Sequence, residues 1–186
     1  KETIEYTSLD NFYDSEENFE DVYYKISKHI IDLAKEGDLV YAVPGHPRVA
    51  EKTVGIIEAM AKENNIEVET IASMSFVDAM FNYLAVDPAD GFKLIDAFEI
   101  ENSYIDTNTS MIITQIYDHF IASNIKLKLM EYYDYDQEVC IVNGAGVKNL
   151  ESKKYVPLHE LDRSENLFNY LTSLYIPKSS KKMYNT

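Results

Sequence analysis

The segment Pro44-Gly45-His46-Pro47 has the residue types of a rigid ligand-binding loop. It follows the apolar run at residues 39–43 and precedes a helical pattern. Glycine allows a ligand to approach the backbone closely, and the two prolines stiffen the loop. Ligands collect at the carboxyl edge of open α/β sheets, so we expect a binding loop here. His46 is its candidate acid, base or hydrogen-bond donor, and the alternative is a plain strand-to-helix connector with a solvated histidine.

A second turn, Asn143-Gly144-Ala145-Gly146, follows the apolar run at residues 138–142. Its spacing fits neither a dinucleotide-binding fingerprint nor a phosphate-binding loop, so a tight turn is the simpler interpretation. The pair Asp118-His119 follows another apolar run, and there a helix-capping aspartate with an exposed histidine is favoured over a catalytic pair.

For the other reactive side chains, a place in the core or on the solvated surface is the simpler interpretation. The four histidines show no metal-ligand spacing, and Cys140, the single cysteine, lies inside an apolar run and is expected in the core. Two acidic runs, at residues 16–21 and 134–138, have the oxygens that Mg²⁺ prefers, but a solvated acidic surface is the default. No G-x-S-x-G motif occurs, which argues against a serine hydrolase elbow.

The first part of the chain alternates helices and strands. Ser15 is expected to cap a helix whose apolar positions recur at spacings of three and four and which ends near Gly37. Strands are expected at residues 39–43 and 66–71, with a helix at residues 49–62 between them. This alternation predicts parallel βαβ units.

The remainder is richer in strands and predicts a mixed sheet. Strands are expected at residues 92–96, 111–117, 138–142, 154–158 and 171–176, and helices at residues 76–81 and 121–132. We place a boundary near residues 72–75. The chain is thus interpreted as a partial N-terminal α/β domain at residues 1–72, a C-terminal α/β domain at residues 73–177 and a polar tail at residues 178–186.

The amino-acid composition limits which binding partners and locations are expected. The 186 residues carry a formal net charge of −15, which repels phosphate backbones, so nucleic acid is not an expected partner. Arg48 and Arg163 are the only arginines. No apolar run approaches the ~20 residues that cross a bilayer, no signal peptide is visible, and a reducing, cytoplasmic location without membrane association is expected.

Several segments, taken in order, resemble the tetrapyrrole (corrin/porphyrin) methylase family, in particular the bacterial branch fused to a MazG-type nucleoside triphosphate pyrophosphohydrolase. They lie at residues 40–47 with 49–53, 75–79 with Asp87-Pro88 and Gly91-Phe92, 115–118, 126–131, and 156–158 with 160–163. Each segment is weak alone, and their shared order carries the resemblance.

The resemblance implies an S-adenosylmethionine-dependent methyltransferase with two α/β domains and the cofactor between them. Its N-terminal domain would hold a parallel sheet, and its C-terminal domain a mixed sheet. By position, the resemblance assigns cofactor binding to Pro44, Gly45, His46, Ser75, Phe76, Gln115, Ile116, Tyr117, Asn143, Gly144 and Ala145. His46 stands where the family has aspartate. No catalytic residue and no metal ligand is assigned.

Two parts of the family pattern are missing from these residues. The family opens with a first strand and a G-x-G-x-G-D-type loop, and Lys1 falls after both. The pyrophosphohydrolase carboxylates are also missing, so we do not expect this chain to hydrolyse nucleoside triphosphates. By resemblance we expect a homodimer, a small-molecule substrate such as a tetrapyrrole, and a covalently linked hydrolase domain in the full-length protein. The alternative is a non-catalytic module that senses a ligand or docks such a hydrolase.

Overall fold

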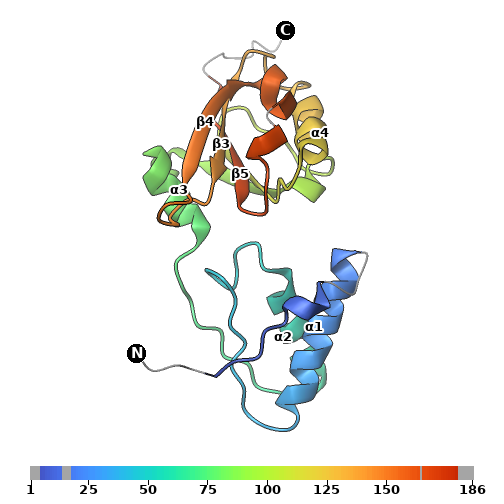
Figure 1. The fold of residues 1–186 in the computed structure, drawn as a ribbon. Helices are drawn as coiled ribbons and strands as arrows, with labels where there is room; N and C mark the ends of the chain where they lie inside the picture. Colours follow the sequence, from blue (N-terminus) through green and yellow to red (C-terminus); the bar gives the residue numbers. More distant parts are fainter. Residues whose placement is uncertain (1–4, 14–17, 164, 180–186) are drawn as a thin grey trace. The chain divides into compact units, whose positions relative to one another are not determined.

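The computed structural model describes residues 5–13, 18–163 and 165–179 (Figure 1). The chain forms two compact units, Lys1–Ser75 and Phe76–Thr186, which are described separately below as unit 1 and unit 2. Within the described residues, every helix is too short or too polar to cross a bilayer.

Unit 1 is built on two packed helices, α1 (Phe19–Ala34) and α2 (Lys52–Glu63), with a 3-10 turn η1 (Asp10–Phe12) beside them. Side chains at helical spacing on α1, among them Val22, Ile26 and Ile30, pack with Ile57 and Ala61 of α2. The predicted helix-capping residue Ser15 lies outside the described residues. Asn18 caps α1 instead, accepting a hydrogen bond from the Asp21 N–H at 2.9 Å.

The described residues of unit 1 contain no strand, which corrects the parallel sheet expected there. Residues 39–43 and 66–71 are extended, but no hydrogen-bonded partner strand lies beside either segment. Val40 is 91% exposed and Ile71 is 76% exposed. Both segments have the apolar composition of strands, but pairing requires a neighbour at about 4.8 Å that the described residues do not supply.

Unit 2 contains a mixed five-stranded sheet with the order β1-β2-β5-β3-β4. The strands are β1 (Phe92–Asp96), β2 (Ser110–Thr114), β3 (Glu138–Asn143), β4 (Ser152–Pro157) and β5 (Thr172–Ile176). Strands β1 and β2 are parallel, and the other three pairs are antiparallel. The expectation of a mixed sheet in the second half of the chain is confirmed.

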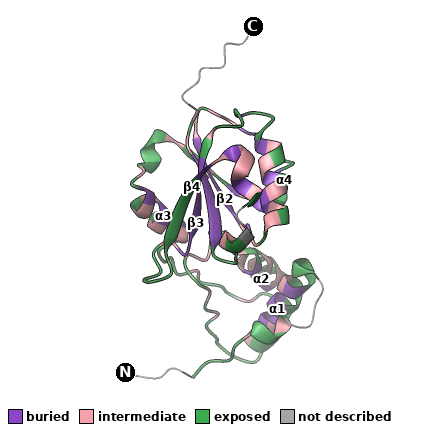
Figure 2. Ribbon diagram, turned by 45° about the horizontal axis from the view of Figure 1, so that its top comes forward, coloured by how far each residue is buried: buried purple, intermediate pink, exposed green. Residues whose placement is uncertain are grey.

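Two helices cover the faces of this sheet, with α3 (Phe76–Leu84) on one side and α4 (His119–Leu129) on the other (Figure 2). Ile113, Ile141 and Leu174 of the central strands share a core cluster with Ile125 and Leu129 of α4. Because alternate residues of a strand face opposite ways, Ile112, Val142 and Tyr175 point to the other face. Every residue of β2 and β5 is therefore buried, and their sequences are apolar or small throughout.

Replacing Ile113 by alanine should destabilise unit 2 by roughly 3 kcal/mol, because the side chain is fully buried and its loss leaves a cavity in the sheet core. Urea unfolding followed by circular dichroism measures the effect. Phe120→Ala is the control, since that ring is 69% exposed, and it should change stability by less than about 0.5 kcal/mol. Equal effects of the two substitutions would contradict this description of the core.

A half-buried ion pair ties α4 to the 3-10 segment η4 (Leu158–Arg163). Lys126 Nζ lies 2.5 Å from Asp162 Oδ2. Partial burial raises the pKa of Asp162, but hydrogen bonds from Lys126 and Ser123 outweigh it and hold that pKa below its usual value. The charged pair therefore stabilises the fold above the unfolded-state pKa of about 3.9, and this contribution is lost as the pH falls through the lower folded-state value.

We expect Asp162→Asn to lower the free energy of unfolding by about 1 kcal/mol at pH 7, because it weakens a charge-assisted hydrogen bond. The difference from the wild-type protein should shrink below about pH 4 as the wild-type carboxylate is protonated. Unfolding curves at several pH values test this. A difference that stays constant down to pH 2 would show that the charge of Asp162 is irrelevant.

Candidate functional site

Polar side chains gather where the strands of unit 2 end. Because β1, β2 and β3 point the same way, their last residues and the first residues of β4 and β5 meet at one edge of the sheet. Asp96 ends β1, Gln115 follows β2 and Asn143 ends β3. We call this the carboxyl edge. Parallel-type edges of this kind are where α/β proteins bind ligands.

Asp96, Gln115 and Tyr117 form a hydrogen-bonded chain at the carboxyl edge. The Gln115 Nε2 donates to Asp96 Oδ2 at 3.0 Å, and the Tyr117 hydroxyl donates to Gln115 Oε1 at 2.8 Å. The other carboxylate oxygen of Asp96 accepts the Phe98 N–H at 3.0 Å and caps a short 3-10 turn. The orientation of the Gln115 amide is thus set from both sides, and all three side chains are only partly buried.

The backbone of Gln115 adopts a φ of 63°, in the left-handed region that side chains other than glycine seldom enter. Such a conformation costs energy and persists where the surroundings impose it. Here β2 ends at Thr114, and the chain then turns so that Ile116 is fully buried while Tyr117 remains partly exposed. The predicted strand at residues 111–117 is therefore too long, and its last three residues are a shaped loop.

Asn143 has a mainly structural role in the described residues. Its Oδ1 accepts the Thr172 hydroxyl at 2.6 Å, and its Nδ2 donates to the Leu167 carbonyl at 3.0 Å. Both strand ends are thereby tied to the loop that precedes β5. The side chain of Asn143 is committed to these contacts and positions the turn that follows it.

The turn after β3 requires glycine. Gly144 has a φ of 55°, and a Cβ atom there would lie 3.2 Å from the Leu150 carbonyl oxygen. Its N–H donates to the Leu171 carbonyl at 3.2 Å, and Ala145 beside it is partly exposed. Gly146, which the sequence analysis did not nominate, has a φ of 80°, and a Cβ atom there would come within 2.8 Å of Ala79 on α3. This glycine allows the turn to approach that helix.

An aromatic group at the carboxyl edge was missed by sequence reasoning. The Tyr117 ring lies 6.1 Å from Phe98 and 5.2 Å from Tyr170, centroid to centroid. Phe98 is 53% exposed and Tyr170 is 79% exposed. The three residues follow β1, follow β2 and precede β5, so only the sheet topology could have indicated that they meet.

The Pro44–Pro47 loop belongs to unit 1. Gly45 has a φ of 78°, and a Cβ atom there would lie 3.6 Å from the Met74 carbonyl oxygen. His46 is partly buried, and its Nδ1 accepts the Arg48 N–H at 3.0 Å. His46 therefore stabilises its own loop, leaving Nε2 as the ring nitrogen that this hydrogen bond does not use.

The predicted site residues thus fall into two groups. Residues 115–117 and 143–145 share one edge of the sheet in unit 2, whereas Pro44, Gly45 and His46 lie on a loop of unit 1. Ser75 is buried at the end of unit 1, and Phe76 begins α3 at the start of unit 2. Among the described residues, no three His, Cys, Asp or Glu side chains converge as a metal site would require.

Comparisons with known proteins agree with this architecture. The chain is 42% identical over 187 residues to the uncharacterised protein YabN of Bacillus subtilis (strain 168). The match covers 100% of this chain and 38% of YabN, so the chain spans well under half of that longer protein.

Solved structures with the same fold include several methyltransferases. Uroporphyrin-III C-methyltransferase from Thermus thermophilus matches with a TM-score of 0.68 at 16% identity, over 83% of this chain and 70% of that chain. The methyltransferase CobJ matches with a TM-score of 0.64 at 11% identity, over 88% and 74%.

A third neighbour is a Thermus thermophilus uroporphyrin-III C-methyltransferase complexed with S-adenosylhomocysteine, with a TM-score of 0.60 at 14% identity, over 83% and 72%. At these identities the likeness concerns the fold.

Residues 2–162 match the sequence profile described as Tetrapyrrole (Corrin/Porphyrin) Methylases. With most of its length covered by that profile, the chain belongs to the tetrapyrrole methylase family.

Proposed function

We propose that the chain is part of an S-adenosylmethionine-dependent methyltransferase and that the carboxyl edge of unit 2 contacts the cofactor. The observation that carries the proposal is the pair of hydrogen bonds that link Asp96, Gln115 and Tyr117, at 3.0 Å and 2.8 Å, on the sheet edge that also holds the Gly144 turn. It presents partly exposed polar groups in a fixed orientation at the sheet edge where ligands of α/β proteins bind.

The chemistry of methyl transfer fits a site without a strong base. The methyl carbon of a sulfonium is already electrophilic, so the protein mainly aligns the acceptor with the donor and excludes water. The hydrogen bonds of Gln115 and Asn143 hold this edge in place, as alignment requires. We therefore assign positioning roles and name no catalytic base.

The aromatic group at the carboxyl edge suits the charge of the cofactor. Aromatic rings attract cations to their faces, and the attraction strengthens when water is excluded. Tyr117 and Tyr170 have their ring centroids 5.2 Å apart, and Tyr170 is largely exposed. We assign these two rings to contact with the adenosyl sulfonium, with Gln115 donating its second amide proton to the cofactor.

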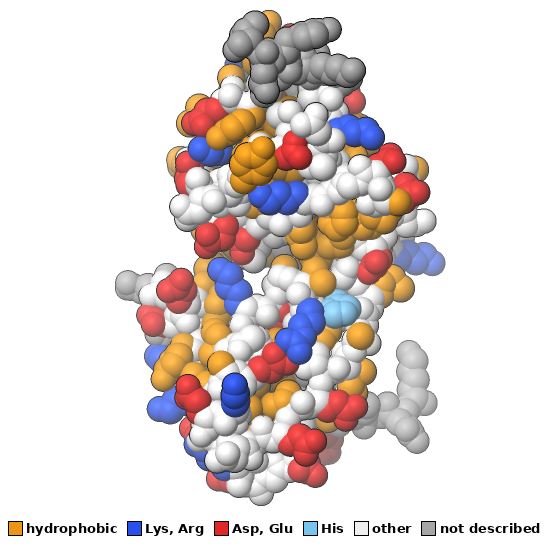
Figure 3. Space-filling view, turned by 180° about the vertical axis from the view of Figure 1, so that it is seen from behind, with side chains coloured by type: hydrophobic (Ala, Val, Ile, Leu, Met, Phe, Trp, Pro, Cys, Tyr) orange, Lys and Arg blue, Asp and Glu red, His pale blue; other side chains and the backbone are white. Residues whose placement is uncertain are grey.

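The methyl acceptor is left open because the chain offers few anchors for a polycarboxylate. Arg48 is paired with Glu58 at 2.5 and 2.6 Å, and Arg163 lies 3.2 Å from Glu160, so both arginines already face a carboxylate. On the face shown in Figure 3, basic side chains of the described residues lie singly among acidic and apolar ones. A tetrapyrrole with several carboxylates would need cations gathered in one place.

The same observation favours a second candidate from another class, a non-catalytic module that senses a ligand or docks a nucleoside triphosphate pyrophosphohydrolase. Both arginines already face carboxylates, and the Nδ1 of His46 accepts a hydrogen bond within its own loop, so these three side chains offer little to a polyanionic acceptor. The match to 38% of YabN leaves room in a longer protein for a MazG-type domain. A homodimer and a cytoplasmic location remain part of both proposals.

Calorimetry with S-adenosylhomocysteine on the full-length protein tests the proposed cofactor site. Gln115→Ala should weaken binding roughly tenfold, because it removes one direct hydrogen bond and releases the Tyr117 hydroxyl. Gln137→Ala is the matched control, since that glutamine is also partly buried but precedes β3, at the opposite end of the sheet from the carboxyl edge. It should leave the affinity unchanged.

Absence of binding at millimolar ligand, or equal losses in the two variants, would contradict a cofactor site at this edge. If S-adenosylhomocysteine binds but no methyl group is transferred to any of the tetrapyrroles tested, the non-catalytic sensing module would be favoured. Mass spectrometry of the products distinguishes these outcomes, because one transferred methyl adds a fixed mass to its acceptor.

A further inference from the structure

The side-chain amide of Gln115 lies between two partners whose hydrogen-bonding capacities differ. An ionised carboxylate can only accept hydrogen bonds, whereas a tyrosine hydroxyl can donate or accept. Asp96 Oδ2 lies 3.0 Å from the amide of Gln115 and therefore requires that Nε2 faces it. Gln115 Oε1 then faces the Tyr117 hydroxyl at 2.8 Å, and this hydroxyl has to donate. Asp96 thus determines the direction of both hydrogen bonds.

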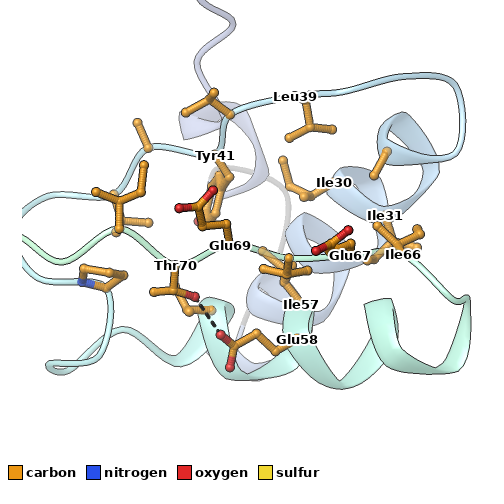
Figure 4. A pocket seen from close by; sticks show the side chains of 18 of the residues that line it. Ile30, Ile31, Leu39, Tyr41, Ile57, Glu58, Ile66, Glu67, Glu69 and Thr70 are labelled. Atoms are coloured by element: carbon orange, nitrogen blue, oxygen red, sulfur yellow. Dashed lines mark hydrogen bonds between the residues drawn. The ribbon is translucent and has the colours of Figure 1, made fainter.

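A carboxylate has this effect on an amide but not on a hydroxyl. In unit 1, the Thr70 hydroxyl donates to Glu58 Oε1 at 2.8 Å (Figure 4). A hydroxyl rotates, and its single oxygen both donates and accepts, so Glu58 does not decide what Thr70 offers to a ligand. The amide of Gln115 has its donor and its acceptor on separate atoms. The carboxylate of Asp96 therefore decides where each of these atoms lies.

Asp96 is itself held in place by the sheet and by a backbone contact. It is the last residue of β1 and is paired in parallel register with Thr114, the last residue of β2. Its Oδ1 accepts the Phe98 N–H at 3.0 Å, and its Oδ2 faces Gln115. Asp96 and Gln115 are both partly buried, and a hydrogen bond is stronger where water is partly excluded.

One N–H of Gln115 is available to a ligand. A primary amide carries two N–H donors, and Asp96 accepts one of them. No other hydrogen bond within the described part of the chain engages Gln115 Nε2. The second N–H belongs to a partly buried side chain at the carboxyl edge, so a ligand bound there meets a donor whose position is fixed.

We propose that Asp96 is a positioning residue that sets the hydrogen-bonding polarity of the cofactor site. By holding the amide nitrogen of Gln115, it makes residue 115 present a donor, and the site selects a ligand atom that accepts. This inference rests on the proposed cofactor site and adds to it the residue that determines which ligand group is recognised.

The negative charge of Asp96 limits the kind of acceptor. Two acceptors on one amide nitrogen lie about 5 Å apart, given ordinary hydrogen-bond distances. A ligand carboxylate in that place would be repelled by the carboxylate of Asp96. The group that Gln115 binds is therefore a neutral acceptor of the adenosyl part of the cofactor, such as a ring nitrogen of adenine.

Calorimetry on the full-length Asp96→Asn variant tests the proposal. Asparagine can keep the Phe98 contact through Oδ1, but it places an amide nitrogen opposite Gln115 Nε2, and two donors cannot bond each other. The amide of Gln115 therefore turns over and presents its carbonyl oxygen to the ligand. We expect the affinity for S-adenosylhomocysteine to fall at least about tenfold. Methylthioadenosine, which keeps the adenosyl group and lacks the carboxylate, should show the same loss.

A swapped pair separates polarity from simple support of the loop. In the double variant Asp96→Asn with Gln115→Glu, the new amide donates to the new carboxylate, which also accepts the Tyr117 hydroxyl. Both hydrogen bonds are regained, but residue 115 has no N–H to offer. We expect the melting temperature to return to the wild-type value, while the affinity for both ligands stays at least about tenfold below that of the wild type.

Asp87→Asn is the matched control. Asp87 Oδ1 also accepts the N–H two residues further on, that of Ala89 at 2.9 Å, and caps the 3-10 turn η2 (Pro88–Asp90). This aspartate precedes β1, at the opposite end of that strand from Asp96. Its substitution should leave both affinities unchanged.

Unchanged affinity in Asp96→Asn, or recovered affinity in the swapped pair, would overturn this inference and leave the cofactor site standing. A loss for S-adenosylhomocysteine alone, with methylthioadenosine bound as well as by the wild type, would overturn the neutral acceptor. If the wild-type protein binds neither ligand, the proposed function fails, and the inference fails with it.

Discussion

The pairing of backbone N–H and C=O groups is the constraint on which the rest of this structure depends. In unit 2, five strands satisfy one another, and the central strands are buried on both faces with apolar side chains. In unit 1, two segments of the same composition remain extended and unpaired among the described residues. An unpaired polar group buried from water costs free energy, so such segments stay exposed or acquire a partner.

The same constraint shapes the carboxyl edge of unit 2. At the carboxyl edge the backbone hydrogen bonds between strands end, and hydrogen bonds made by side chains follow them. Asn143 and Thr172 close one part of the edge, whereas Asp96, Gln115 and Tyr117 keep groups partly exposed. The left-handed backbone at Gln115 is a local cost that the packing of Ile116 and the hydrogen bonds of its side chain offset. Rigidity at this edge comes from the sheet behind it.

The sequence predicts the elements of unit 2 well, because local pattern and burial agree there. The apolar run of β3 is buried in the sheet, and α4 follows the helix-capping residue Asp118. Asn18 and Ser15 are both good helix caps, so residue type alone could not choose between them. The run at residues 39–43 has the propensity of a strand, but pairing depends on a non-local neighbour that propensity does not encode.

For the candidate site, the glycine after the apolar run at residues 138–142 correctly indicated the tight turn at Gly144, while the contacts around Gly144 and Gly45 lay beyond sequence reasoning. The meeting of Phe98, Tyr117 and Tyr170 depends on the strand order, which places β5 beside β2 although they are far apart in the chain. The role of Asn143 likewise depends on Thr172 and Leu167, which no local motif connects to it.

A crystal structure of the full-length protein with S-adenosylhomocysteine tests the central claim most directly. The account predicts ligand density in contact with residues 115–117 and beside Gly144, with an aromatic ring of the carboxyl edge against the sulfur end of the ligand. Density at another place in the molecule, or none at millimolar ligand with this edge covered by protein side chains, would contradict it.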